Sequence, residues 1–445
     1  MPDNKLVQQI TEGLSEIPVL DVHTHLVGDH LGARGLHDVL LYHMLVSDLY
    51  SAGCPTGSRL TEYPGWPTTE EAHARIEEAI PFLPHIRGTS TWWMVRETLA
   101  GLYDWKEPLT ADNWRKLDDL IRERADDRSW QLSILDLLNI KRTCTELARR
   151  ESGASDDRLQ YALEWAFFTR SQWGEFDTAL YELERCWGRE PESPTAIGSG
   201  GRPSTDKTIR TLDDVHAALQ HYVTHIPYDQ LLSTATHIST DIRFREVDDA
   251  TMATALAQRA NASQEERDIY ASYIQELFLT ELEKRGDRIV YQFSLAAEPL
   301  PYETGSRISQ TTIAELGGMI SRHPNLRFQC FLASVHANQS LCTFARELPN
   351  FSLAGFWWHN FFPTAMRHVF SERLDMVPLN KQIGFFSDAY CVEGCYGKAL
   401  MVRAQVAHVF AEKIEQGQYT MDEAMSIARS LVYETPQSLN GMVPA

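Results

Sequence analysis

Two histidines separated by a single residue are the residues of this chain whose type and spacing most directly indicate chemistry. They lie in segment 21–26 (DVHTHL), directly after the apolar run 17–20 (IPVL). The apolar run predicts a short buried strand. Because successive side chains of an extended chain point to opposite faces, His23 and His25 are expected on one face. Two imidazoles at a strand end could bind one divalent metal ion, with zinc or a neighbouring metal favoured. Two histidines with unrelated structural roles are the alternative.

An aspartate near the other end of the chain could complete such a site. Asp388 ends segment 381–388 (KQIGFFSD), which predicts another strand. In a closed parallel barrel the first and eighth strands are neighbours, so Asp388 is expected beside His23 and His25 at the carboxyl end, where barrel enzymes place their chemistry. Two imidazoles and one carboxylate leave metal positions open, as a catalytic site requires. A helix N-cap is the alternative role for Asp388.

The elements that would position these residues are short apolar segments that alternate with longer helical patterns. Eight candidate strands are found, at 17–20, 140–144, 159–166, 230–235, 288–295, 327–333, 352–357 and 382–387. This alternation favours an α/β fold, a TIM-like (β/α)8 barrel, although an open doubly wound sheet would give a similar pattern. Residues 30–135 show helical patterns and aromatic residues but no clear strand. We therefore predict a barrel over 1–29 and 136–445, with 30–135 as a helical insertion after the first strand.

Length and composition limit the class of protein and its partners. The chain has 445 residues, of which 43% are hydrophobic, and a formal net charge of -20. This length suits one large domain with insertions or two domains. The excess of negative charge argues against nucleic acid or an anionic membrane as a partner. An anionic small substrate stays possible, because a locally basic pocket could hold it.

Three further patterns bear on location and on other kinds of site. No apolar run is long enough to cross a membrane and no segment resembles a signal peptide, so we expect a cytoplasmic protein. The seven cysteines are expected as free thiols, and Cys391 and Cys395 lack a second pair that would complete a structural zinc site. Segment 197–208 is rich in Gly, Ser and Pro but lacks the ending of a phosphate-binding loop, so it predicts a flexible connector.

The chain resembles the uronate isomerase branch of the amidohydrolase superfamily over nearly its whole length. The resemblance rests on the Asp-x-His-x-His opening, on LLYH at 40–43, on GFWW at 355–358 and on SDA at 387–389. It implies a distorted (β/α)8 barrel, a helical insertion after the first strand, and one divalent metal ion bound by His23, His25 and Asp388. The usual superfamily histidine on the fifth strand is absent here, as it is in uronate isomerases.

The positions that bind the substrate carboxylate in that family differ in this chain. Where the family has a tyrosine proposed as an acid/base group, this chain has Met44. Three family arginine positions hold Tyr390, Val335 and Glu164 or a near neighbour. Each replacement of an arginine removes a bidentate contact to a carboxylate. The scaffold and the metal ligands therefore match the family, whereas the carboxylate pocket does not.

Histidines near the ends of three predicted strands could transfer protons. His237 ends the fourth strand, His336 follows the sixth, and His359 follows the tryptophan pair of the seventh. Because histidine titrates near neutral pH, it suits a proton shuttle or a general base. For each residue alone, a hydrogen-bonded loop histidine is the alternative. We predict catalytic roles for His237, His336 and Asp388. The residues predicted to bind substrate are His43, Trp357, His359, Tyr390 and Arg307.

Two classes of reaction are compatible with these residues, and a barrel kept as a binding protein is a third alternative. In the first, the enzyme isomerises an aldose and a ketose of a uronate or related sugar, and Arg243 or Arg307 replaces the lost carboxylate clamp. Surface ion pairs are the alternative role of both arginines. In the second, a metal-activated water hydrolyses a non-uronate substrate and Asp388 accepts its proton. We expect one divalent ion, with zinc favoured, and a sugar or sugar acid as substrate. A homo-oligomer and a monomer both stay open.

Overall fold

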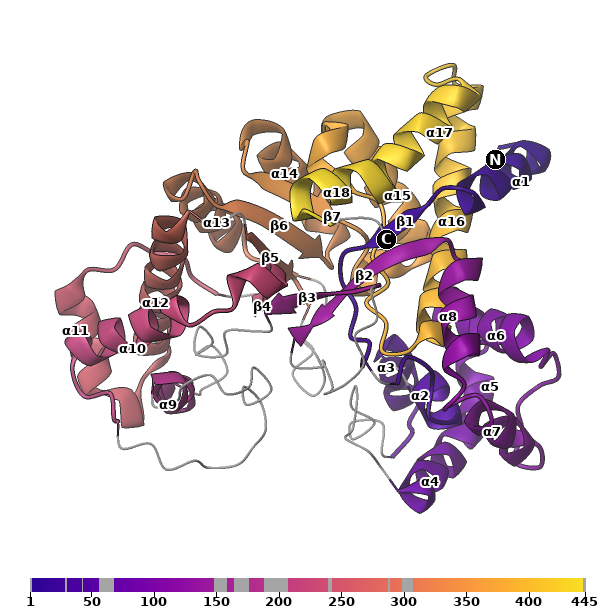
Figure 1. Cartoon of the computed structure of the whole chain (residues 1–445), viewed down its shortest axis with the longest axis horizontal. Helices are drawn as coiled ribbons and strands as arrows, with labels where there is room; N and C mark the ends of the chain where they lie inside the picture. The colour runs from indigo at the N-terminus through magenta and orange to yellow at the C-terminus, as the bar shows by residue number, and fades with distance from the viewer. Residues whose placement is uncertain are drawn as a thin grey trace.

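Eight parallel strands form one curved sheet in chain order, each paired with the next (Figure 1). The strands are β1 (Val19–Asp21), β2 (Ile140–Glu146), β3 (Leu159–Leu163), β4 (Leu231–Ile238), β5 (Val290–Leu295), β6 (Arg327–Leu332), β7 (Phe351–Ala354) and β8 (Gln382–Ile383). They lie at the eight predicted positions, which confirms a TIM-like α/β fold. The computed structural model describes residues 2–28, 30–41, 43–55, 68–147, 158–163, 176–187, 207–238, 242–286, 289–297 and 307–442.

In the described part of the chain no ladder joins β8 to β1. Individual hydrogen bonds instead join the segments that follow these two strands. The Asp388 amide donates to the His23 carbonyl at 3.0 Å, and the His25 amide donates to the Ala389 carbonyl at 2.8 Å. The predicted eighth strand, 382–387, is too long. β8 ends at Ile383 because the next amide, that of Gly384, donates to the carbonyl of Leu431 instead of to a neighbouring strand.

Helices cover the outside of the sheet (Figure 1). They are α1 (Asn4–Ser15), α9 (Phe176–Trp187), α10 (Leu212–Thr224), α11 (Asp249–Ala257), α12 (Gln264–Arg285), α13 (Gln310–Arg322), α14 (Val335–Glu347), α15 (Pro363–Met376), α16 (Val392–Glu415), α17 (Met421–Arg429) and α18 (Thr435–Asn440). Local signals set their ends: α12 begins with a capping box between Ser263 and Glu266 and ends at Gly286 in the left-handed conformation. None of the described helices is both long and apolar enough to cross a membrane.

A second group of helices lies between β1 and β2, together at the lower right of Figure 1. It comprises α2 (Leu36–Leu40), α3 (His43–Ser51), α4 (Thr69–Ala79), α5 (Leu83–Ile86), α6 (Ser90–Tyr103), α7 (Trp114–Arg122) and α8 (Arg128–Leu137). The apolar faces of α2 to α7 pack on one another in a cluster that includes Leu36, Ile76 and Trp114. Ile134 and Leu135 of α8 belong instead to the cluster that includes residues of β1 and β2. The treatment of residues 30–135 as an insertion separate from the barrel stays a prediction.

A chain of buried amides crosses the interior of the barrel. The hydroxyl of Ser233 donates to the side chain of Gln292 at 2.9 Å, and the Gln292 amide donates to Gln329 at 2.8 Å. Gln292 also donates to the Val22 carbonyl, which lies beyond the end of β1 on another side of the barrel. Asn440 of α18 exchanges hydrogen bonds with Gln329. Side chains on the same face as Ser233 and Gln292 therefore point into the barrel.

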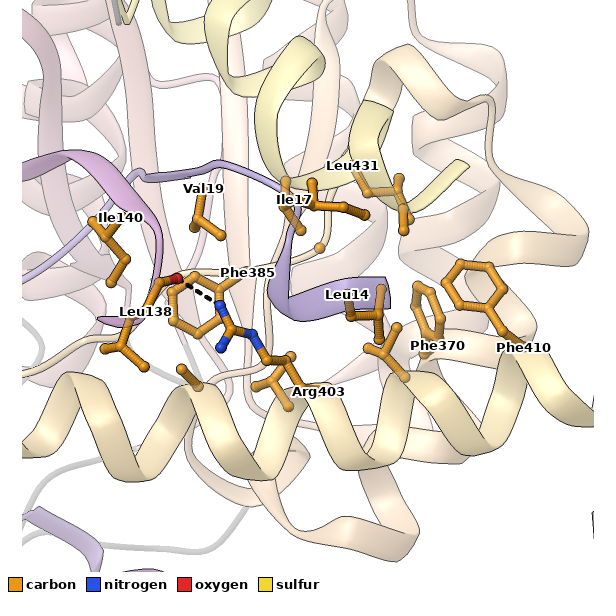
Figure 2. Close-up of a pocket in the computed structure, with 16 residues that line it drawn as sticks. Leu14, Ile17, Val19, Leu138, Ile140, Phe370, Phe385, Arg403, Phe410 and Leu431 are labelled. Atoms are coloured by element: carbon orange, nitrogen blue, oxygen red, sulfur yellow. Dashed lines mark hydrogen bonds between the residues drawn. The ribbon is translucent and has the colours of Figure 1, made fainter. Parts of the chain in front are cut away.

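A small apolar cavity of about 40 Å³ lies at the amino end of the strands (Figure 2). Val19 and Ile140, the first residues of β1 and β2, line it together with side chains of α1, α16 and the segment after α17. The Arg403 guanidinium beside it donates to the Leu138 carbonyl at 2.5 Å, and burial lowers the pKa of Arg403. Because its lining is mostly apolar, we interpret this cavity as a gap in the packing and not as a catalytic site.

Candidate metal centre

His23, His25 and Asp388 come together at the carboxyl end of the barrel. Nε2 of His23 lies 3.4 Å and Nε2 of His25 lies 3.2 Å from Oδ1 of Asp388. All three side chains are buried, and one possible ligand atom from each lies within 4.8 Å of the other two. Two imidazole nitrogens and one carboxylate oxygen at this spacing fit one divalent ion and leave further coordination positions for water or substrate.

The backbone on both sides fixes the extended segment that carries the two histidines. The amide and the hydroxyl of Thr24 both donate to the Cys144 carbonyl of β2, at 2.7 and 3.0 Å. On the other side the hydrogen bonds to residues 388 and 389 hold the segment. Asp388 adopts φ of +50°, a left-handed conformation that is uncommon for a residue other than glycine. The ligands therefore lie on a backbone that is fixed by hydrogen bonds to two neighbours.

A buried glutamate that the sequence analysis missed contacts His25. Oε1 of Glu146, the last residue of β2, lies 2.6 Å from Nδ1 of His25, and Glu146 is 1% exposed. His25 thus has one carboxylate at each ring nitrogen. Although burial acts to lower it, the charges and hydrogen bonds of Glu146 and Asp388 raise the pKa of His25 to about 10. At His23 burial prevails over the hydrogen bond to Asp388 and lowers the pKa.

A buried lysine that the sequence analysis also missed lies behind Asp388. Nζ of Lys398, in α16, lies 3.1 Å from the Asp388 carbonyl oxygen and 3.5 Å from Oδ2 of its carboxylate. Lys398 is 2% exposed, and its Nζ lies 5.3 Å from the ring centroid of Phe361. A buried cation at this distance favours the ionised form of the aspartate, which is the form that binds metal.

Besides these charged groups, aromatic side chains contact the two histidines. The His23 ring lies 4.9 Å from Phe331 and 5.8 Å from Phe386, measured between ring centroids. The His25 ring stacks on Tyr390 at 4.4 Å with an interplanar angle of 19°. Tyr390, for which we predict a substrate contact, thus lies directly against a metal-ligand candidate.

His237 points into the barrel at the carboxyl end of β4. It pairs with Ser294 in the register of β4 and β5, and it lies four residues beyond Ser233, on the same face of the strand. Its Nδ1 lies 2.8 Å from the hydroxyl of Ser294. Its ring centroid lies 5.5 Å from that of Trp357, and both side chains are buried. The structure therefore brings a predicted catalytic residue next to a predicted substrate-binding residue.

Comparisons with known proteins place the fold. No family model and no curated protein sequence matches this chain. A uronate isomerase from Thermotoga maritima matches over 98% of both chains, with a TM-score of 0.75 and 14% identity. A glucuronate isomerase from Caulobacter crescentus matches over 99% of this chain and 95% of its own, with a TM-score of 0.77 and 15% identity. The chain has the fold of the uronate isomerases. A protein from Lactobacillus casei described as a metal-dependent hydrolase matches over 97% of both chains, with a TM-score of 0.58 and 11% identity.

The uronate isomerase fold confirms the resemblance found in the sequence at the level of the fold. At these identities the likeness does not carry individual residue roles. Met44, at the position of the family tyrosine, is buried and packs against the barrel core. Val335 begins α14, and Glu164 lies outside the described residues. The departures from the family pattern at Met44 and Val335 stay predictions.

No described contact joins the remaining predicted site residues to the metal-ligand candidates. His336 is exposed on the first turn of α14, and no described contact joins it to them. His359 is half-buried beside Trp358, and Arg307 is exposed shortly before α13. His43 is the first residue of α3. The roles predicted for His336, His359, Arg307 and His43 stay predictions.

Arg243, one of two possible substitutes for the carboxylate clamp, forms an ion pair with the protein itself. Its Nε lies 2.9 and 3.1 Å from the two carboxylate oxygens of Glu315, which also accepts the Phe244 amide. The structure therefore shows the ion-pair role that was the alternative for Arg243. The role predicted for Arg307 in binding a substrate carboxylate is not tested by this ion pair.

Proposed function

We propose that this protein is a metal-dependent isomerase that interconverts the aldose and ketose forms of a uronate or a related sugar. One observation carries the proposal: His23, His25 and Asp388 converge at the carboxyl end of a barrel that has the uronate isomerase fold. Barrel enzymes bind substrate at this end of the strands. We propose zinc as the metal, on the basis of two imidazole ligands and one carboxylate.

The reaction moves one proton between neighbouring carbons and another between their oxygens. The bound ion supplies a Lewis acid for the carbonyl and hydroxyl oxygens of the substrate. His237 is the proposed residue for the proton that moves between the carbons. Because its Nδ1 contacts the Ser294 hydroxyl, transfer would run through Nε2. Trp357, beside His237, would stack on the apolar face of the sugar.

Recognition of the substrate must differ from that in the family, because the family arginines are replaced. Tyr390 would donate its hydroxyl to a substrate oxygen from its place against His25. Arg307, between β5 and α13, would supply the charge for a carboxylate. His336, on the first turn of α14, and His359, which follows β7, would contribute further polar groups. A substrate held by one arginine instead of three is held less tightly at its carboxylate.

A metal-dependent hydrolase is the second candidate. The likeness to the Lactobacillus casei protein and the replacement of the family arginines both favour it. In that reaction Asp388 would accept the proton of the attacking water, and Lys398 would keep the carboxylate ionised until then. The two candidates share the metal ligands and differ in the substrate.

Proton NMR of the metal-loaded protein with glucuronate and with galacturonate in D2O tests the proposal. Metal content is measured on the same sample, and the Asp388→Asn variant is the control for contaminating isomerase. Formation of the ketose by the wild type alone would support isomerisation. No conversion of either sugar by protein that holds its metal would contradict action on these uronates. Assays with lactones and amides would then test the hydrolase.

A further inference from the structure

Glu146 lies against His25 at Nδ1, the ring nitrogen that does not face Asp388, and no role has been assigned to it there. We propose that Glu146 is a positioning residue: it accepts a hydrogen bond from Nδ1 of His25 and so fixes Nε2 of that histidine as the nitrogen that binds the ion. This inference rests on the proposed metal site. It adds a residue to that site that neither the sequence motifs nor the fold comparisons indicate.

The two ring nitrogens of His25 face two different carboxylates. Nδ1 lies 2.6 Å from Oε1 of Glu146, and Nε2 lies 3.2 Å from Oδ1 of Asp388. Because the outward directions of Nδ1 and Nε2 diverge, Glu146 and Asp388 approach the His25 ring from different sides. Glu146 is therefore placed to orient a ligand, and it is not placed to be one.

An imidazole that binds a metal ion is neutral and carries one proton, and the position of this proton decides which nitrogen binds the ion. A carboxylate at 2.6 Å from Nδ1 holds the proton there, so the lone pair lies on Nε2. Carboxylates that accept a hydrogen bond from a metal-binding histidine orient the ring and increase its basicity in many metal sites. The stacked ring of Tyr390 restricts rotation of His25 further.

The position of Glu146 is itself fixed by the sheet. Glu146 pairs with Ala162 of β3, and the preceding residue, Thr145, donates its hydroxyl to the Leu26 carbonyl at 2.7 Å. Burial of a carboxylate is costly unless it is paired, so a glutamate that is 1% exposed at this place calls for a charged or hydrogen-bonding partner. His25 is such a partner.

The second histidine provides an internal contrast. The described ring contacts of His23 outside the ligand group are with Phe331 and Phe386, and these two rings can restrict its position but cannot select its protonated nitrogen. We therefore expect substitutions of Glu146 to change the ring orientation of His25 and to reach His23 only through the loss of charge.

Zinc affinity, measured by competition with a chromophoric chelator, tests the inference in the Glu146→Gln and Glu146→Leu variants. Glutamine keeps an acceptor and removes the charge, whereas leucine removes both. We expect affinity to fall about 10-fold for Glu146→Gln and about 100-fold for Glu146→Leu. Glu184→Gln is the matched control: Glu184 is also buried, but it accepts from the Ile209 amide in another part of the molecule. Its affinity should equal that of the wild type.

The outcomes separate this inference from the proposed function. A wild type that binds no zinc would overturn both. A wild type that binds zinc, with the same affinity in Glu146→Leu, would overturn the role of Glu146 alone.

A measurement on the wild type covers the case in which the leucine variant does not fold. In zinc-loaded protein labelled with 15N-histidine, His25 should carry its proton on Nδ1, with its signals assigned by their loss in His25→Gln. A proton on Nε2 would overturn the inference.

Discussion

His25 and His323 have immediate partners of the same type, two carboxylates each, but different surroundings. Both imidazoles are buried, and both have a carboxylate at each ring nitrogen. For His25 these are Glu146 and Asp388, at 2.6 and 3.2 Å. For His323 they are Glu283 and Glu276, at 3.0 and 3.2 Å. A histidine between two carboxylates is therefore not by itself a sign of a metal site.

The partners of the carboxylates distinguish the two places. At the outer site, where α12 and α13 end, Glu276 also pairs with Arg322 and Glu283 also accepts the Asn325 amide. That site is a closed network that joins two helix ends. At the barrel site, Oδ1 of Asp388 faces a second imidazole, that of His23. The feature that favours a metal ion at the barrel site is that two imidazoles converge on one carboxylate oxygen, at the end of the strands where barrel enzymes bind substrates.

The largest expected effect is the loss of metal from His25→Ala. Removal of one of three protein ligands should reduce bound zinc from about one ion per chain to less than about a tenth of that after dialysis. Metal content measured by mass spectrometry checks this. His323→Ala is the matched variant and should retain its metal. Full metal occupancy in His25→Ala would remove the distinction between the two sites.

A second variant separates the residue proposed to transfer a proton from the residues proposed to bind the metal. His237→Gln keeps a polar group near Ser294 but cannot act as a base near neutral pH. We expect turnover to fall about 10²- to 10⁴-fold with metal content unchanged. The exposed His368→Gln is the control. His336→Gln, tested in parallel, should also slow turnover if His336 acts in catalysis. Unchanged rates in His237→Gln would assign His237 a structural role.

The sequence was sufficient for the parts of the site that depend on local periodicity. His23 and His25 share a face because they are two residues apart in an extended segment. Asp388 could be placed beside them because strands one and eight are neighbours in a closed barrel. The eight strand positions followed from short apolar runs between helical patterns. Each of these inferences needs one element or one rule of chain order.

The residues that the sequence did not reveal depend on register between elements. Glu146 contacts His25 because β1 and β2 pair with Asp21 opposite Thr143, and no periodicity within either strand specifies this register. Lys398 lies in a long helix, and its burial is set by the rotation of α16 against the barrel. A charged residue inside an otherwise apolar face of that helix was the available signal. For His336, its place after β6 predicted the carboxyl end of the barrel, but it did not predict that the side chain is exposed.

The outer site should show its own dependence on pH. Although burial acts to lower it, the hydrogen bonds and charges of Glu276 and Glu283 raise the pKa of His323 above its ordinary value of 6.5. The folded protein therefore binds this proton more tightly than the unfolded chain does. The resulting stabilisation is complete below about pH 6.5, the unfolded pKa, and is lost as pH rises through the higher folded pKa.

The smallest expected effect is accordingly a stability difference that changes with pH. His323→Gln should lower the free energy of unfolding by about 2 kcal/mol near pH 6 and by less near pH 9, because the hydrogen bond of a charged imidazole to Glu283 and its ion pair with Glu276 are lost. Urea denaturation of the variant and the wild type at both pH values measures the difference. His368→Gln should show no such change between them. An equal loss at both pH values would mean that His323 acts as a neutral hydrogen-bonding group. The interpretation of its surroundings as a charged network, unlike those of His25, would then be wrong.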